Sequence, residues 1–158
     1  MKLKGIIETD TVNYKKISMV LEFPICKGFK CDRECGQQVC QNSALATAPD
    51  INVRYAYIVN KYINNPITQA ICFQGLEPFD SWEDLITLVA YLRVRTNDDI
   101  VIYTGYNKEE IADKVEKLKR YPNIIIKFGR YIPNQQPHYD DILGVNLASD
   151  NQYAEIIS

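Results

Sequence analysis

The segment AICFQGLEPFDSWEDLITLVAYLRVRTNDDIVIYTG, residues 70–105, places a helix-like stretch between two strand-like ones. Ala70–Phe73 and Asp99–Tyr103 are apolar, β-branched runs of strand length. Ser81, followed by Asp84 in capping-box spacing, predicts the start of the intervening helix. One face of that helix is apolar and carries Trp82, Leu85, Ile86, Val89 and Leu92. A strand, a helix and a strand of these lengths predict a right-handed crossover between parallel strands.

The same alternation extends to both sides of this unit. Leu3–Ile7 and Ile17–Phe23 are predicted strands before it, and the second leads into a cysteine-rich loop. Asp50 could cap a helix over residues 50–64, which Asn65-Pro66 would end. Asn107 with Glu110 predicts a further helix, and Asn123–Phe128 a further strand. The sequence therefore predicts an α/β fold with a mostly parallel sheet.

Polar or glycine-containing segments directly follow the predicted strands. They are the cysteine loop, residues 24–42, and the segments Gln74–Pro78, Tyr103–Tyr106 and Phe128–Tyr131. Ligands of open parallel sheets bind at the carboxyl ends of the strands. We therefore expect these four segments to meet at one edge of the sheet and to form the functional site there.

Composition narrows the class of protein. The 158 residues suit a single domain, residues 1–158, and neither an internal repeat nor a linker interrupts them. A net charge of −2 gives no broad attraction to nucleic acid or to an acidic membrane. No apolar run approaches the ~18 residues of a membrane span, and the first residues lack a signal-peptide pattern. We expect a cytoplasmic protein that binds neither nucleic acid nor membrane.

Four of the five cysteines lie within fifteen residues, in the pattern Cys26-x4-Cys31-x3-Cys35-x4-Cys40. Clustered thiols in a chain without an export signal indicate metal or redox chemistry. Thiolates suit iron–sulfur clusters and zinc, and the single compact loop is a poorer match to the paired hooks of structural zinc sites. Redox-active or structural thiols are the third alternative, and the loop alone does not decide among the three. The fifth cysteine, Cys72, sits in an apolar strand and is expected to be a buried hydrophobe.

Five short motifs occur in an order that resembles a known family. They are Cys40-Gln41-Asn42, Gln74-Gly75-Leu76-Glu77-Pro78, Tyr103-Thr104-Gly105-Tyr106, Gly129-Arg130-Tyr131-Ile132 and Ser149-Asp150-Asn151-Gln152. In this the chain resembles the activating proteins of anaerobic ribonucleotide reductase. More broadly, it resembles the radical S-adenosylmethionine activases of glycyl-radical enzymes. The likeness covers roughly residues 17 to 157.

The resemblance implies a single radical-SAM-like domain folded as a partial (βα) barrel. It implies a [4Fe–4S] cluster with three thiolate ligands, whose fourth iron binds the amino and carboxylate groups of S-adenosylmethionine. Reductive cleavage would then produce a 5′-deoxyadenosyl radical. The implied partners are a glycyl-radical enzyme such as anaerobic ribonucleotide reductase, and a reductant such as flavodoxin or ferredoxin. The cofactor would carry the chemistry, and the protein would bind, orient and exclude water.

The resemblance also suggests roles for individual residues. Cys40 aligns with the last family cysteine, Cys26 and Cys31 are taken as the other two ligands, and Cys35 is the alternate. The family turn that grips the methionyl amino group aligns with Gly75, Leu76, Glu77 and Pro78. Thr104 and Gly105 align with a segment that lines the S-adenosylmethionine site. Asn151 and Gln152 align with a tail that closes it.

Three departures from the family pattern qualify these roles. The family spacing is Cys-x3-Cys-x2-Cys, and no triple of cysteines here matches it. Leu76 replaces a glycine, at a cost of ~1–2 kcal/mol if that position requires positive φ. Lys127-Phe128 stand where the family often has an acidic residue.

Two alternative functions stay open. One is a zinc-stabilised, non-catalytic interaction domain that uses all four loop cysteines, and the other is a radical enzyme that acts on another substrate.

Overall fold

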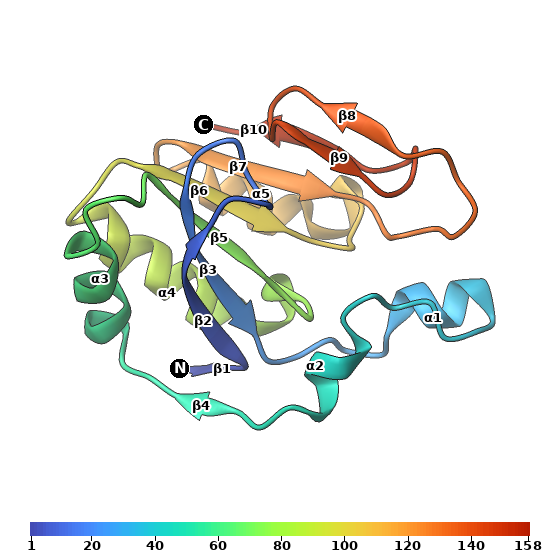
Figure 1. Cartoon of the computed structure of the whole chain (residues 1–158), viewed down its shortest axis with the longest axis horizontal. Coiled ribbons are helices and arrows are strands. Elements are labelled where there is room, and N and C mark those ends of the chain that lie inside the picture. Colours follow the sequence, from blue (N-terminus) through green and yellow to red (C-terminus); the bar gives the residue numbers. More distant parts are fainter.

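A central sheet of six strands organises the protein, which a computed structural model describes over residues 1–158 (Figure 1). In chain order the strands are β2 (Gly5–Asp10), β3 (Ser18–Phe23), β5 (Ala70–Gly75), β6 (Asp99–Tyr103), β7 (Ile124–Phe128) and β10 (Tyr153–Ile156). Their order across the sheet is β10-β7-β6-β5-β3-β2. The four central strands are parallel, whereas β2 and β10 pair antiparallel at the two edges. The expected α/β class and mostly parallel sheet are confirmed.

Three helices cover one face of the sheet: α3 (Tyr55–Ile63), α4 (Trp82–Arg93) and α5 (Ala112–Leu118) (Figure 1). Successive strand residues point to opposite faces, so Leu21, Phe73 and Ile126 join the larger core beneath the helices. Burial of each such side chain stabilises the fold by ~1.5–3 kcal/mol. The helices thus fix the sheet from one side only.

The opposite face packs a smaller core. Val20, Cys72 and Val101 point to this face, where Tyr14 and the antiparallel hairpin of β8 (His138–Asp140) and β9 (Val145–Leu147) cover them. Cys72 is fully buried, as expected of a small hydrophobe. It takes no part in the cysteine loop.

Several predicted boundaries were wrong. The helix expected from Asp50 begins only at Tyr55, because Ile51–Asn52 forms strand β4, which pairs with β1 (Lys2–Leu3). This pairing also separates β1 from β2, so residues 3–7 are not one strand.

The capping box expected at Ser81 is not formed. A 3₁₀ turn, η1 (Pro78–Ser81), precedes α4, and the buried Ser81 hydroxyl has no hydrogen-bond partner. The Asp84 carboxylate instead accepts a hydrogen bond from the Tyr55 hydroxyl at 2.5 Å. The helix start expected at Asn107 is correct: η2 (Lys108–Ile111) leads into α5, and Glu110 accepts from the Asn107 N–H at 2.8 Å.

The cysteine loop lies outside these layers, beside the arrowheads of the parallel strands (Figure 1). It contains one short helix, α1 (Lys30–Cys35), and a second, α2 (Ser43–Thr47), follows it; neither helix buries a residue. The parallel strands end nearly in step, because Phe23 is opposite Gly75 and Tyr103 is opposite Lys127. The loop therefore faces an even edge of the sheet. No helix in the chain is both long and apolar enough to cross a bilayer.

Candidate metal centre

The four segments that follow the parallel strands meet around one cavity of about 330 Å³. Its walls come from the cysteine loop, from the end of β5, from the end of β6 and from the residues after β7. The remaining lining comes from Asn13 and from residues near the carboxyl terminus, Asn146–Ala148 and Gln152. The expected meeting of the four segments at one edge of the sheet is therefore confirmed.

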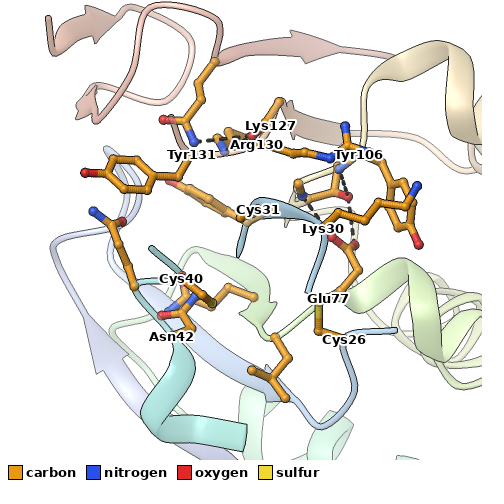
Figure 2. A pocket seen from close by; sticks show the side chains of 18 of the residues that line it. Cys26, Lys30, Cys31, Cys40, Asn42, Glu77, Tyr106, Lys127, Arg130 and Tyr131 are labelled. Carbon is orange, nitrogen blue, oxygen red and sulfur yellow. Dashed lines mark hydrogen bonds between the residues drawn. The ribbon is translucent and has the colours of Figure 1, made fainter. Parts of the chain in front are cut away.

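Three of the four loop cysteines line this cavity. Cys26 precedes α1, Cys31 lies in its first turn and Cys40 follows it, and their side chains border the cavity from different sides (Figure 2). Cys35, the last residue of α1, is not part of the lining. No three His, Cys, Asp or Glu side chains are grouped as the ligands of one metal ion. The three cysteines predicted as ligands therefore line one cavity without being grouped as a metal site, and the alternate, Cys35, lies outside the lining.

Burial raises the pKa of the Cys26 thiol to about 11, and the backbone N–H of Phe29 opposes this shift. Burial also raises the pKa of the Cys31 thiol, opposed by the backbone N–H of Tyr131. A metal replaces the thiol protons, and thiolate sulfur is the preferred ligand of an iron–sulfur cluster. A half-buried set of three thiols around one cavity therefore fits such a cluster chemically.

Glu77 is the buried carboxylate of the cavity. Its oxygens accept hydrogen bonds from the Thr104 hydroxyl at 2.8 Å, the Gly105 N–H at 2.9 Å and the Phe79 N–H at 3.1 Å. Burial raises the pKa of Glu77 to about 7, and these three donors oppose that shift. Glu77, which Figure 2 labels, thus forms one wall together with Thr104 and Gly105, and this wall is built from two strand ends.

The turn after β5 differs from the expectation for Leu76. The positive φ of this turn, +99°, falls on Gly75, and Leu76 is not among the residues with positive φ. A Cβ on Gly75 would lie 2.7 Å from the Phe23 backbone nitrogen, so the glycine also permits close approach of two strands. The Asn42 side chain donates to the Gly75 carbonyl at 2.8 Å. Leu76 lines the cavity without strain, whereas Pro78 begins η1 and does not line it.

Two basic residues, Lys127 near the end of β7 and Arg130 just after it, were not assigned a role from the sequence. Lys127 is 7% exposed, and its ammonium group donates to the Gly129 carbonyl at 2.8 Å. Burial lowers the pKa of Lys127 to about 8, and attraction by Glu77 opposes this shift. A lysine within the apolar run IIIKF was the signal that could have identified it.

Arg130 joins the cysteine loop to the rest of the site. Its guanidinium donates to both Glu110 carboxylate oxygens, at 2.6 and 2.7 Å, and its Nε lies 3.1 Å from a carboxylate oxygen of Glu34. Lys30 also donates a hydrogen bond to Glu110, at 2.9 Å. Glu34 and Lys30 both belong to α1, so this cluster of charges holds α1 beside the cavity.

The predicted tail motif holds the segment after β7. The Asn151 side chain donates to the Arg130 carbonyl at 2.8 Å, and the Gln152 side chain donates to the Gly129 carbonyl at 3.3 Å. The Ser149 hydroxyl accepts from the Ile132 N–H at 3.3 Å. The tail therefore supports one wall of the cavity, and Gln152 itself lines it.

A family model for the 4Fe-4S single cluster domain matches residues 26–152, which is well over half of the chain. The chain belongs to this family. The match of the 4Fe-4S single cluster domain begins at Cys26 and ends at Gln152, so it spans the loop cysteines and the tail motif. Searches of curated proteins and of solved structures gave no match. Membership favours the iron–sulfur interpretation of the loop over the zinc alternative.

Proposed function

We propose that the protein binds a [4Fe–4S] cluster through Cys26, Cys31 and Cys40 and cleaves S-adenosylmethionine reductively. The main support is the cavity at the edge of the sheet, which three loop thiols and the buried Glu77 line together. Because Cys35 stands outside the lining, three thiolates are available for a cluster of four irons. One iron would remain free for an exogenous ligand.

When bound, the reduced cluster supplies one electron to the sulfonium, so that the S–C5′ bond breaks into methionine and a 5′-deoxyadenosyl radical. The protein contributes the surroundings. Glu77 and Lys127 are both buried in the cavity wall and carry opposite charges when ionised. This pair suits the ammonium and carboxylate of an α-amino acid, because each buried charge is stabilised by an opposite one. A cavity of about 330 Å³ lies within the usual range of small-molecule sites.

The arrangement of strands supports a further part of the proposal. Four parallel strands, with their crossover helices on one face, correspond to part of a (βα) barrel, and the cavity lies at their carboxyl ends. That is the edge at which (βα) barrel enzymes bind substrates. We propose that the sheet is a partial barrel of the radical-SAM type.

We propose a glycyl-radical enzyme, such as anaerobic ribonucleotide reductase, as the substrate of the radical. The support is the sequence resemblance, which covers roughly residues 17 to 157. A protein substrate could cover the cavity and exclude water. Flavodoxin or ferredoxin would supply the electron, and the reducing cytoplasm is the compartment in which free thiols persist.

Anaerobic reconstitution tests the proposal. The protein, loaded with iron and sulfide and reduced with dithionite, should show a broad absorbance near ~400 nm and convert S-adenosylmethionine to 5′-deoxyadenosine. Addition of an anaerobic ribonucleotide reductase should then yield an electron paramagnetic resonance signal of a glycyl radical. A colourless protein with one tightly held zinc and no 5′-deoxyadenosine would overturn the proposal and favour the interaction-domain alternative.

A further inference from the structure

The Asp32 side chain links Cys31, its neighbour in the chain, to Cys40 through a hydrogen bond. It lies directly after Cys31 in the first turn of α1. A single oxygen of its carboxylate, Oδ1, accepts hydrogen bonds from the backbone N–H groups of Val39 and Cys40, both at 2.7 Å. Asp32 itself does not line the cavity. Its contact with Cys40 is therefore made behind the site.

This contact matters because apolar burial does not hold the loop. Neither α1 nor α2 contributes a buried residue, so their positions depend on polar contacts. α1 is fixed to the sheet by Lys30 and Glu34, which pair with Glu110 and Arg130. Nothing in those pairs holds Cys40, which lies five residues beyond the end of α1. The Asp32 carboxylate makes the hydrogen bonds that join Cys40 to the anchored helix.

The Cys26 side of the loop has an equivalent contact. One carboxylate oxygen of Asp80 accepts from the Lys27 N–H at 2.5 Å, and the other accepts from the Tyr106 hydroxyl at 2.7 Å. Each flanking cysteine thus has an aspartate that binds a backbone N–H at or next to it. Hydrogen bonds to ionised acceptors are the stronger class, so these contacts can fix a loop that lacks a core.

We propose that Asp32 is a positioning residue for the cluster: its carboxylate sets the place of the Cys40 thiolate relative to Cys31 without binding iron. The inference rests on the ligand set given under the proposed function. Outer contacts that orient metal ligands commonly change metal affinity when they are removed. Loss of Asp32 should therefore weaken retention of the cluster while the sheet stays folded.

The test compares Asp32→Ala, Asp32→Asn and, as a control, Asp113→Ala. Asp113 is exposed on α5, and its side chain makes no hydrogen bond or ion pair. Each protein is reconstituted anaerobically, and the loss of its absorbance near ~400 nm is followed after addition of a chelator. Asp32→Ala should lose the cluster about tenfold faster than wild type, whereas Asp113→Ala should match wild type. Asp32→Asn keeps an acceptor oxygen for both N–H groups and should restore most of the retention.

Two further readouts separate positioning from general stability and from charge. The apo-proteins should share one thermal midpoint, because the Asp32 carboxylate binds two backbone N–H groups of the loop and α1 buries no residue in the core. Asp32→Asn should raise the reduction potential, since a negative charge is removed near the cluster. Equal chelation rates in Asp32→Ala and wild type, or a lowered apo midpoint that accounts for the loss, would overturn the inference. Wild-type protein that forms no cluster would instead refute the proposed function.

Discussion

The Thr104 hydroxyl donates to the Glu77 carboxylate at 2.8 Å, and both side chains are buried. The same hydroxyl accepts a hydrogen bond from the Tyr106 N–H at 3.0 Å. Thr104 therefore links the end of β6 to the carboxylate that follows β5. This contact joins two strand ends within one wall of the cavity.

Replacement of Thr104 tests that link. Thr104→Val keeps the shape of the side chain but leaves an oxygen of Glu77 and the Tyr106 N–H without this partner, at a cost of ~1–3 kcal/mol. Urea denaturation should show this loss, and the yield of 5′-deoxyadenosine should fall with it. Thr104→Ser retains the hydroxyl and should stay near wild type. Equal stability of the valine and serine variants would contradict the link.

The raised pKa of Glu77 predicts a pH dependence of stability. Burial raises this pKa from an ordinary value near 4.5 to about 7, so the folded state disfavours the ionised form. The negative charge of Asp80 also raises the pKa of Glu77. Attraction by Glu77 in turn raises the pKa of Lys127. Stability present below about pH 4.5 is therefore lost as the pH rises through about 7, by up to ~3 kcal/mol.

The apo-protein should accordingly unfold at lower urea concentration at pH 8 than at pH 5. In Glu77→Gln this part of the pH dependence should disappear, although the variant is less stable at both values because its amide faces the Gly105 N–H. The comparison uses the change between the two pH values for each protein. Parallel changes in wild type and variant would show that Glu77 is not the titrating group.

The burial of Lys127 predicts that its replacement raises the stability of the apo-protein but weakens binding of S-adenosylmethionine. Its ammonium is buried with one hydrogen-bond acceptor, the Gly129 carbonyl, which is a costly environment for a charge. Lys127→Met should raise the thermal midpoint of the apo-protein and weaken S-adenosylmethionine binding, measured by calorimetry, about tenfold or more. Lys119→Met, which removes an exposed lysine paired with Glu116, should change neither by much. Unchanged binding by Lys127→Met would remove Lys127 from the ligand site.

The cysteines themselves can be ranked by iron content. Cys26→Ala, Cys31→Ala and Cys40→Ala each remove a thiol from the cavity wall, so the reconstituted proteins should lose most of their iron. Cys35→Ala is the matched control, because its thiol comes from the same loop and lies outside the lining. Iron should remain near the wild-type value in that variant. A drop for all four cysteines would contradict the three-ligand proposal.

A comparison of Gly75 with Gly36 separates the cost of a positive φ from the cost of steric crowding around an added Cβ. Both have positive φ, +99° and +69°. An added Cβ would lie 2.7 Å from the backbone nitrogen of Phe23 at Gly75, but has nothing within 4 Å at Gly36. Gly36→Ala should cost ~1–2 kcal/mol for the conformation alone. Gly75→Ala should cost clearly more in urea denaturation; equal costs would argue against the close approach.

The parts of the fold set by local sequence could be predicted. The β-branched runs became strands, and the Asn107–Glu110 pattern marked a helix start, because both depend on nearest neighbours. The helix expected over residues 50–64 is present, but its predicted start at Asp50 was wrong because Ile51–Asn52 pairs with residues near the amino terminus, a contact that no local pattern reveals. The Ser81 cap was wrong because Pro78 began a 3₁₀ turn first.

In the site, too, features set by local sequence and strand order could be predicted, whereas those that depend on distant contacts could not. The order of the strands was enough to bring Cys26, Glu77 and Thr104 to one edge, because parallel strands share a direction. Loop spacing alone could not tell which cysteine faces outward; that depends on the turn of α1. Lys127 and Asp32 were missed as contributors because their partners are backbone groups placed by the fold.

The cysteine loop contributes none of its helical side chains to the core, so the apo-chain can complete its sheet and helices before any iron arrives. Cluster assembly would then act on a finished scaffold, and loss of the cluster to oxygen would leave a protein that can be reloaded. An inorganic group held on a loop outside the core could thus be replaced without refolding of the sheet.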